Sequence, residues 1–270
     1  DVTGRDVILV DFSYKADVLL QMQLVANSIL VLDHHKSAEA DLQANPLTSD
    51  DQLTVVRIEG FDAEADPTWS HFRGWVEMDK VEGIRKATIY ALFDMERSGA
   101  GIAWDFFHPG KARPALIDHV EDRDLWRFAL QHTREICATV HSYPWTFEAW
   151  DALVAESTYS LYQQGLVLER GRAKEVTEQV ELCRRTLTIG HYTVPAANVP
   201  RSLVSDAGHA LAQGKPFAAC YFDKAEGRVF SLRSTVDGID VSEVAKLYGG
   251  GGHARAAGFT VARDHELARA

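Results

Sequence analysis

Two short apolar runs, each ending in side chains that can bind a metal ion, constrain this chain most. Residues 6–11 read Asp-Val-Ile-Leu-Val-Asp, and residues 28–35 read Ser-Ile-Leu-Val-Leu-Asp-His-His. The apolar part of each run is unbroken, which predicts a strand buried on both faces, as in a parallel sheet. Open α/β sheets place ligands at the carboxyl ends of their strands. If the two strands are neighbours, Asp11 and the triplet Asp33-His34-His35 face one crevice.

The segments around these runs predict an α/β fold. Apolar residues at helical spacing over 17–26 put a helix between the two strands, which is the unit of a parallel sheet with right-handed crossovers. A short helix over 36–44 ends at Asn45-Pro46. Further strands are expected over 53–58 and 87–93, further helices over 102–107 and 114–120, and a loop over 62–69. The rest of 60–86 shows no clear pattern.

A change near residue 188, from helical patterns to short strand patterns, predicts a second domain. Residues 131–187 are mainly helical, and 159–185 form a polar amphipathic stretch that suits a connector between domains. Short strands and two helices, over 202–212 and 240–247, follow. We therefore expect a parallel-sheet domain with a helical connector over 1–187 and a smaller α/β domain over 188–270.

The side chains expected at the sheet edge suit a divalent cation. Carboxylates combined with imidazoles favour Mn²⁺ or a similar ion, whereas oxygen ligands alone favour Mg²⁺ or Ca²⁺. The simpler alternative is that Asp33 caps the next helix beside two solvated histidines, and that Asp11 is a turn residue.

The run Glu-Asp-Arg-Asp at 121–124 offers one more carboxylate, from Asp122 or Asp124. The alternative is that these carboxylates form exposed salt bridges with Arg123 and Arg127, as charged runs usually do. The adjacent Leu125-Trp126 instead indicates partial burial, and a buried carboxylate needs a cation, a metal or several donors.

A second group of candidate residues lies near the C-terminal end. Arg233-Ser234 is followed by four glycines, 249–252, and then by His253 and a run of small residues that we expect to form a helix. Glycines let the backbone approach a phosphate closely, and a helix N-terminus supplies N–H donors. Arg233 could grip phosphate in a bidentate manner, and His253 could bond a phosphate or stack on a base. The alternative is a flexible glycine-rich loop.

Charge and cysteine content limit the classes of partner. The formal net charge is 28 − 39 = −11, which argues against a general duplex-DNA binder. An apolar run long enough for a membrane span and a secretory signal are both missing from the sequence, so we expect a cytoplasmic protein that does not bind membranes. The three cysteines, Cys137, Cys183 and Cys220, are far apart and fit a reducing compartment with the thiols buried.

The triplet at 33–35 and the Gly-Gly-Gly-His-x-x-Ala-Ala-Gly sequence at 250–258 together resemble the DHH phosphoesterase family with its companion DHHA1 domain. The resemblance extends over essentially the whole chain. It implies a site for two divalent metals, usually Mn²⁺ (or Mg²⁺), with Asp11 bridging them and His34 as a ligand. It implies that His35 faces the scissile phosphate and that Asp33 orients the histidines. Asp122 best matches a further metal ligand, with Asp124 as the second choice. The resemblance also implies that the nucleotide or phosphate tail of the substrate is bound by Arg233, Gly251, Gly252 and His253.

One departure from the family pattern affects the expected metal site. The first family motif, of the type His-x-x-x-Asp-x-Asp, has no match in the ten residues upstream of Asp11. Either the natural N-terminus is missing here or the protein is a degenerate member. We therefore expect a weakened or half-occupied site, with one ion in place of two.

The leading prediction is a metal-dependent phosphoesterase acting on short single-stranded oligonucleotides or small nucleotides. Short substrates are favoured because long polymers bind along an extended basic groove, which an acidic protein lacks. A nucleotide-binding or regulatory protein with an inactive metal site is the alternative. Pyrophosphate hydrolysis ranks third, because relatives with that activity lack the glycine–histidine sequence. A homodimer is left open.

Overall fold

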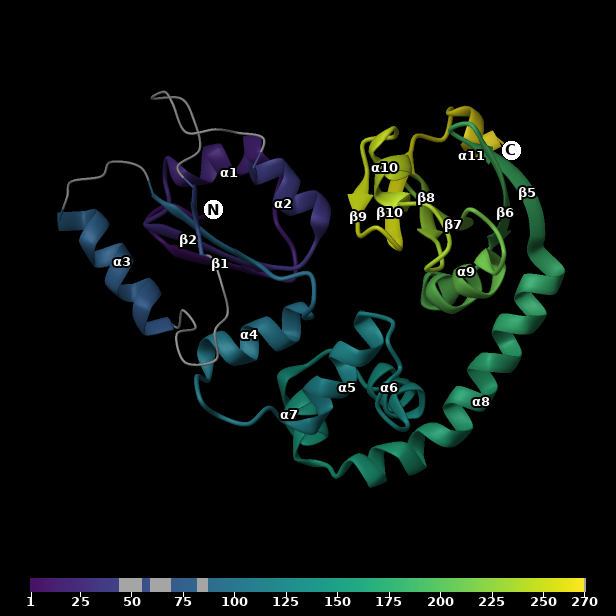
Figure 1. The fold of residues 1–270 in the computed structure, drawn as a ribbon, viewed down its shortest axis with the longest axis horizontal. Helices are drawn as coiled ribbons and strands as arrows, with labels where there is room; N and C mark the ends of the chain where they lie inside the picture. The colour runs from purple at the N-terminus through teal and green to yellow at the C-terminus, as the bar shows by residue number, and fades with distance from the viewer. Residues whose placement is uncertain (44–54, 59–68, 82–86, 270) are drawn as a thin grey trace. The chain divides into compact units, whose positions relative to one another are not determined.

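The computed structural model describes residues 1–43, 55–58, 69–81 and 87–269, which divide into two compact units (Figure 1). Unit 1 is Asp1–Glu169 and unit 2 is Arg170–Ala270, so the division falls inside helix α8, Thr158–Cys183. The boundary expected at 187/188 lies within strand β5, Arg184–Ile189. That strand pairs along its whole length with β6 (Tyr192–Asn198) and so belongs to unit 2.

Unit 1 contains the predicted parallel sheet. Its strands are β1 (Asp6–Val10), β2 (Ser28–Asp33), β4 (Ile89–Phe93) and β3 (Val55–Arg57), in that spatial order, and each neighbouring pair is parallel. The α/β fold class and the two strands expected from the apolar runs are confirmed. Burial on both faces is wrong for β1, which is the first strand in the sheet order and leaves Ile8 39% exposed. The expected start of the third strand, residues 53 and 54, and the expected loop up to residue 68 lie outside the described residues.

The central strand β2 is buried on both faces, as its unbroken apolar run predicts. Ile29 and Val31 pack with side chains of α1 (Ala16–Gln23) and α2 (Lys36–Gln43). Leu30 and Leu32 pack on the other side with side chains of α3 and α4, which span Trp69–Val81 and Gly99–Phe107. Burial of both faces holds the carboxyl end of β2 rigidly in place, and this is where the Asp-His-His triplet begins.

Helices complete unit 1 after the sheet. They are α5 (Ala115–Asp124), α6 (Thr133–Ser142), α7 (Phe147–Ala155) and the first half of α8, packed around a small apolar core that includes Leu116, Ile136, Val140, Leu153 and Leu161. Helix α5 extends four residues beyond the expected 114–120, so the whole acidic run 121–124 is helical. Helix α3 forms in a stretch where the sequence shows no clear pattern.

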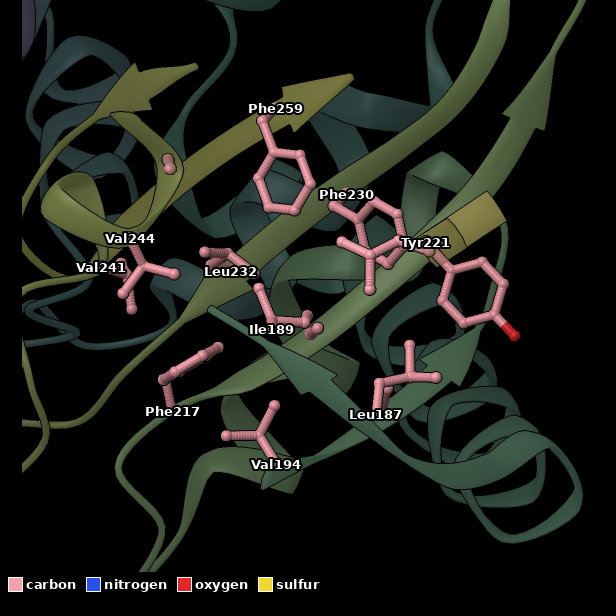
Figure 2. Close-up of a cluster of buried hydrophobic side chains, with 14 of the residues drawn as sticks. Leu187, Ile189, Val194, Phe217, Tyr221, Phe230, Leu232, Val241, Val244 and Phe259 are labelled. Atoms are coloured by element: carbon pink, nitrogen blue, oxygen red, sulfur yellow. The ribbon is translucent and has the colours of Figure 1, made fainter. Parts of the chain in front are cut away.

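Unit 2 is a six-stranded sheet in the order β5-β6-β7-β8-β10-β9, antiparallel except for the β6–β7 pair. The new strands are β6 (Tyr192–Asn198), β7 (Ala218–Lys224), β8 (Gly227–Arg233), β9 (Gly251–Gly252) and β10 (Ala256–Val261). Its helical segments are η1 (Arg201–Leu203), α9 (Val204–Ala212), α10 (Val241–Lys246) and α11 (Glu266–Arg269). Figure 2 shows one face of the sheet, where Phe230 and Phe259 stack with ring centroids 4.9 Å apart and α10 contributes Val241 and Val244.

The helix expected after the glycine run does not form. Residues 253–255 make a turn between β9 and β10, in which the His253 N–H donates to the Ala256 carbonyl at 2.8 Å. A Cβ at Gly250 would lie 2.1 Å from the Gly258 carbonyl oxygen, and one at Gly252, where φ is +137°, would lie 2.6 Å from the Ala256 oxygen. Glycine is therefore required at 250 and 252 by the close approach of strand β10, and the helix predicted after the glycine run is wrong.

Two further observations bear on the sequence predictions. Among the described residues no helix is both long and apolar enough to cross a membrane. Cys137 and Cys220 are buried, as expected, and burial raises the pKa of each thiol to about 12.

Helix α8 contains a matched pair of glycines that tests its packing. A Cβ at the buried Gly165 would lie 1.9 Å from the Glu135 carbonyl oxygen of α6, whereas one at the exposed Gly171 would meet nothing within 4 Å. We expect Gly165→Ala to lower the free energy of unfolding of unit 1 by about 1–3 kcal/mol through overpacking. All six tryptophans precede residue 170, so urea unfolding followed by tryptophan fluorescence reports on unit 1. Gly171→Ala is the control, and an equal loss in both variants would contradict the expectation.

Candidate metal centre

Asp11, which directly follows strand β1, has a backbone conformation that few non-glycine residues adopt. Its φ is +64°, in the left-handed region, and such a backbone costs about 1–3 kcal/mol. Its side chain is 56% exposed, so the carboxylate can reach a ligand. A Cβ added to Gly99, the first residue of α4, would lie 2.5 Å from both Cβ and Oδ1 of Asp11. The close contact with the N-terminus of α4 therefore limits where the Asp11 carboxylate can point.

Asp33, at the end of β2, organises the two histidines that follow it. Its buried Oδ1 accepts hydrogen bonds from the backbone N–H groups of His34, at 2.8 Å, and His35, at 3.3 Å. The same oxygen lies 2.7 Å from Nδ1 of His35. Helix α2 begins at Lys36, so these bonds go to residues that precede the helix and Asp33 does not cap it. The alternative of two solvated histidines is also wrong, because His34 is only 2% exposed.

The interaction with Asp33 affects both the orientation and the charge of His35. A carboxylate can only accept a hydrogen bond, so Nδ1 of His35 carries a proton and the imidazole ring is held in one orientation. Burial lowers the pKa of His35, but the hydrogen bond to Asp33 and the charges of Asp33, Asp11 and Asp124 outweigh it, and the pKa is raised from 6.5. His35 therefore keeps its positive charge to higher pH than a free imidazole.

Two carboxylates approach the same nitrogen of His34. Nε2 of His34 lies 3.0 Å from Oδ1 of Asp11 and 3.3 Å from Oδ2 of Asp124, the last residue of α5. Burial raises the pKa of Asp124, and the neighbouring Asp11 raises it further, while His34 lowers it. Bringing two carboxylates to one point costs free energy that a bound cation would offset.

These residues fit a divalent metal ion. One potential ligand atom from each of Asp11, His34 and Asp124 lies within 4.8 Å of the other two, and the same holds for Asp11, Asp33 and His35. Oδ2 of Asp33 is buried and has no hydrogen-bond partner among the described residues, which is costly unless a cation or donor reaches it. The mixture of oxygen and nitrogen donors suits an ion of the Mn²⁺ type.

Asp122, the first choice for the further ligand, does not belong to this cluster. It is 5% exposed, and its carboxylate accepts hydrogen bonds from Ala129 N, Leu130 N and Thr133 Oγ1 at 2.8, 3.1 and 2.6 Å. Positions 122 and 124 lie two residues apart on a helix, so they face different directions. The structure brings the fallback residue, Asp124, to His34.

The C-terminal candidates lie on adjacent strands of unit 2. Arg233 on β8 pairs with Ala256 of β10, and β10 pairs in turn with Gly252 of β9. The guanidinium of Arg233 donates to Ser205 Oγ and to the Leu232 carbonyl, both at 2.9 Å. Gly251, Gly252 and His253 are partly accessible. These residues can offer backbone N–H groups and an imidazole to an anion, without the expected helix.

Sequence reasoning missed the role of the segment that starts α4. The helix expected from the sequence starts only at residue 102, after the stretch Ser98-Gly99-Ala100-Gly101. In the structure Ser98 is the N-cap of α4, and its Oγ accepts a hydrogen bond from Gly101 N at 3.1 Å. A serine at the start of an apolar helical stretch is the signal that could have revealed it.

Comparison with known families identifies the C-terminal part of the chain. Residues 202–270 match the DHHA1 domain, and unit 1 carries Asp-His-His at the carboxyl end of a central parallel strand. The C-terminal part of the chain is therefore similar to a DHHA1 domain, and the chain as a whole resembles the DHH family.

The chain also resembles a viral protein. It is 27% identical over 272 residues to the uncharacterized protein R106 of Acanthamoeba polyphaga mimivirus. The match covers 96% of the chain and 53% of R106, so the chain spans about half the length of the curated relative it matches.

Solved structures give weaker likenesses. A pGpG-specific phosphodiesterase, PggH, from Vibrio is 13% identical, with a TM-score of 0.36, over 97% of this chain and 94% of that one. A DHH domain described as a member of a family of ribosomal proteins is 12% identical, with a TM-score of 0.44, over 94% and 65%. An exopolyphosphatase-related protein from Bacteroides fragilis is 10% identical, with a TM-score of 0.36, over 98% and 89%. Likenesses at these TM-scores do not point to any one substrate.

Proposed function

We propose that this protein is a metal-dependent phosphoesterase that hydrolyses phosphoester bonds of short single-stranded oligonucleotides or small nucleotides. The observation that carries the proposal is the convergence of Asp11 and Asp124 on Nε2 of His34, beside a His35 whose orientation Asp33 sets. The net charge of −11 favours short substrates, because long polymers gain affinity from an extended basic surface.

Each residue of the cluster has a proposed task. Asp11, His34 and Asp124 hold the divalent cation, Mn²⁺ in preference to Mg²⁺, and a bound ion of this kind lowers the pKa of a water molecule toward neutrality. His35, with its proton held on Nδ1 by Asp33, presents Nε2 to a phosphate oxygen and stabilises negative charge there. Asp33 acts by orienting the imidazole and by fixing its tautomer.

The residues of unit 2 supply the proposed contacts to the substrate. Arg233, Gly251, Gly252 and His253 would bind its phosphate groups or nucleotide. The support comes from the DHHA1 match over 202–270 and from the gathering of these residues on neighbouring strands. Because β9 and β10 take the place of the expected helix, backbone N–H groups of a glycine turn would replace a helix dipole in this contact.

The test combines metal binding with turnover. After removal of metal by a chelator, the protein is titrated with Mn²⁺ by calorimetry and then assayed on a dinucleotide, a 3′-phosphorylated mononucleotide and a long single strand. We expect Mn²⁺ binding, and Mn²⁺-dependent cleavage that is faster on the short substrates. Binding of nucleotide without cleavage under any divalent ion would favour a regulatory protein, and the lack of Mn²⁺ binding would contradict the metal assignment.

A further inference from the structure

The two carboxylates of the candidate metal centre come from elements far apart in the sequence. Asp11 follows β1, and Asp124 ends α5. Helix α4 contacts both of these elements, because Gly99 at its start abuts the Asp11 side chain while α4 packs along α5. The start of α4 is therefore placed to set the spacing of the two carboxylates.

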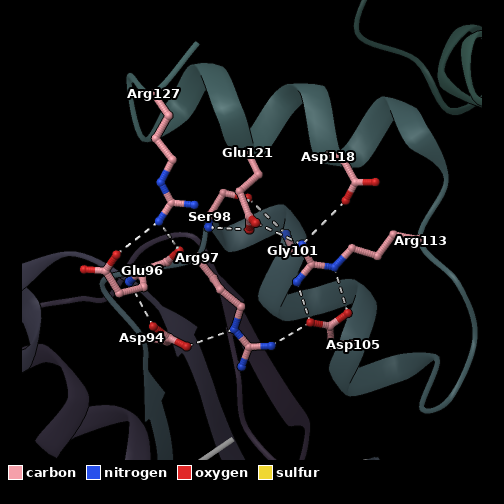
Figure 3. Close-up of polar contacts among 10 residues, drawn as sticks. All are labelled: Asp94, Glu96, Arg97, Ser98, Gly101, Asp105, Arg113, Asp118, Glu121 and Arg127. Atoms are coloured by element: carbon pink, nitrogen blue, oxygen red, sulfur yellow. Dashed lines mark hydrogen bonds and ion pairs between the residues drawn. The ribbon is translucent and has the colours of Figure 1, made fainter. Parts of the chain in front are cut away.

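Glu121 fastens α5 to the start of α4. It lies one turn before Asp124, and its Oε2 accepts hydrogen bonds from Ser98 N, at 2.9 Å, and from Ser98 Oγ, at 3.3 Å (Figure 3). A Cβ at Gly101 would lie 2.1 Å from the same oxygen, so the carboxylate sits directly against the first turn of α4. The Glu121 side chain is 13% exposed, and water competes little for these bonds.

An ion-pair network holds Glu121 in this position. Arg113 donates to Oε1 of Glu121 at 3.0 Å and forms a two-point contact with Asp105 of α4, through Nε at 2.9 Å and Nη2 at 2.5 Å. Asp105 also accepts from Arg97, which bonds Asp94 just after β4 (Figure 3). Bidentate pairs between arginine and carboxylate are both strong and directional. The network thus ties the carboxyl edge of the sheet to α4 and α5.

We propose that Glu121 is a positioning residue for the metal centre, which joins α5 to the N-terminus of α4 and thereby sets the distance between Asp124 and Asp11. The inference rests on the proposed function, since it concerns the same cluster. Glu121 itself is not a ligand, because its carboxylate is engaged by Ser98 and Arg113. Partners that orient metal ligands typically contribute about 10–100-fold in affinity or activity.

The test compares Glu121→Gln with Asp118→Asn. Asp118 lies on the same helix and contacts the same arginine, at 3.8 Å, but it is 45% exposed. We expect Glu121→Gln to raise the Kd for Mn²⁺ by about 10–100-fold, and Asp118→Asn to leave it unchanged. Calorimetry with Mn²⁺ gives the Kd, and tryptophan fluorescence during urea unfolding of the metal-free protein gives its stability.

The outcomes separate positioning from structural support. A merely structural Glu121 would lower the stability of the metal-free protein and leave the Kd of the folded protein unchanged, and that result would overturn the inference. If Glu121→Gln does not fold, Glu121→Asp keeps the charge but withdraws the carboxylate from Ser98, and an unchanged Mn²⁺ affinity in that variant would equally overturn it. Failure of the wild type to bind Mn²⁺ would instead contradict the proposed function.

Discussion

Replacing His34 by alanine is expected to reduce Mn²⁺-dependent cleavage by at least about 100-fold, since even residues that only support metal ligands contribute about 10–100-fold. His34 is 2% exposed and lies within 3.3 Å of both carboxylates, so the substitution removes a nitrogen on which Asp11 and Asp124 both converge. Initial rates on a dinucleotide over a range of Mn²⁺ concentrations measure the effect.

The His34→Ala experiment needs a control for the loss of any imidazole. His191 is exposed and lies outside the cluster, and His191→Ala should retain the wild-type rate. Circular dichroism confirms that both variants are folded. A wild-type rate in folded His34→Ala would remove His34 from the metal site.

The second large effect is expected at Asp122, and it concerns stability. The Asp122 carboxylate holds the loop after α5, in which Trp126, Phe128 and His132 have φ values of 56°, 49° and 69°. Its third bond comes from Thr133 Oγ1, which also contacts the buried His119 at 2.9 Å. Asp122→Ala leaves these donors unsatisfied and the left-handed residues without support, so we expect the free energy of unfolding to fall by about 2–4 kcal/mol.

The effect of Asp122 should depend on pH. Burial raises its pKa, but the bonds from Thr133, Ala129 and Leu130 outweigh burial, and the pKa is lowered from 3.8. The contribution of the Asp122 carboxylate to the free energy of unfolding is therefore complete above pH 3.8 and is lost as the pH falls through the lowered pKa. Urea unfolding of wild type and Asp122→Ala across this range should show two curves that converge toward acid.

Two comparisons make the Asp122 prediction specific. Asp118→Ala, on the exposed side of α5, should change the free energy of unfolding little. Asp122→Asn should retain Mn²⁺ affinity far better than Asp124→Asn, because only Asp124 reaches His34. A larger loss of Mn²⁺ affinity in folded Asp122→Asn would return Asp122 to the metal site, as the family resemblance first indicated.

Local pattern was enough to predict the elements that carry the triplet. The unbroken apolar run before Asp33 can only be satisfied by cover on both faces, and β2 is fully buried in the middle of a parallel sheet. Parallel strands bring their carboxyl ends to one edge, so the approach of Asp11 to His34 follows once β1 pairs with β2. The glycine–histidine sequence likewise indicated the DHHA1 domain.

The sequence pattern did not predict the role of a residue whose contacts lie far away in the sequence. The glycines at 249–252 suit a helix start as well as a tight hairpin, and pairing of β10 with β8 decides for the hairpin. The roles of Glu121, Asp122 and Asp124 depend on how α5 is turned about its axis, and that rotation is set by packing against α4 and α6. A charge run carries no signal of this rotation, because its residues are all equally polar.

The sequence by itself determined the parallel sheet, the Asp-His-His triplet at its edge and the resemblance to the DHH family, because these depend on local apolar runs and short motifs. Only the tertiary structure decided that Asp124, and not Asp122, reaches the triplet, and that Glu121 joins α5 to the start of α4. These contacts depend on which faces of the helices pack against each other. Local sequence preferences are too weak to set the rotation of α5, which is decided only when the whole of unit 1 is packed.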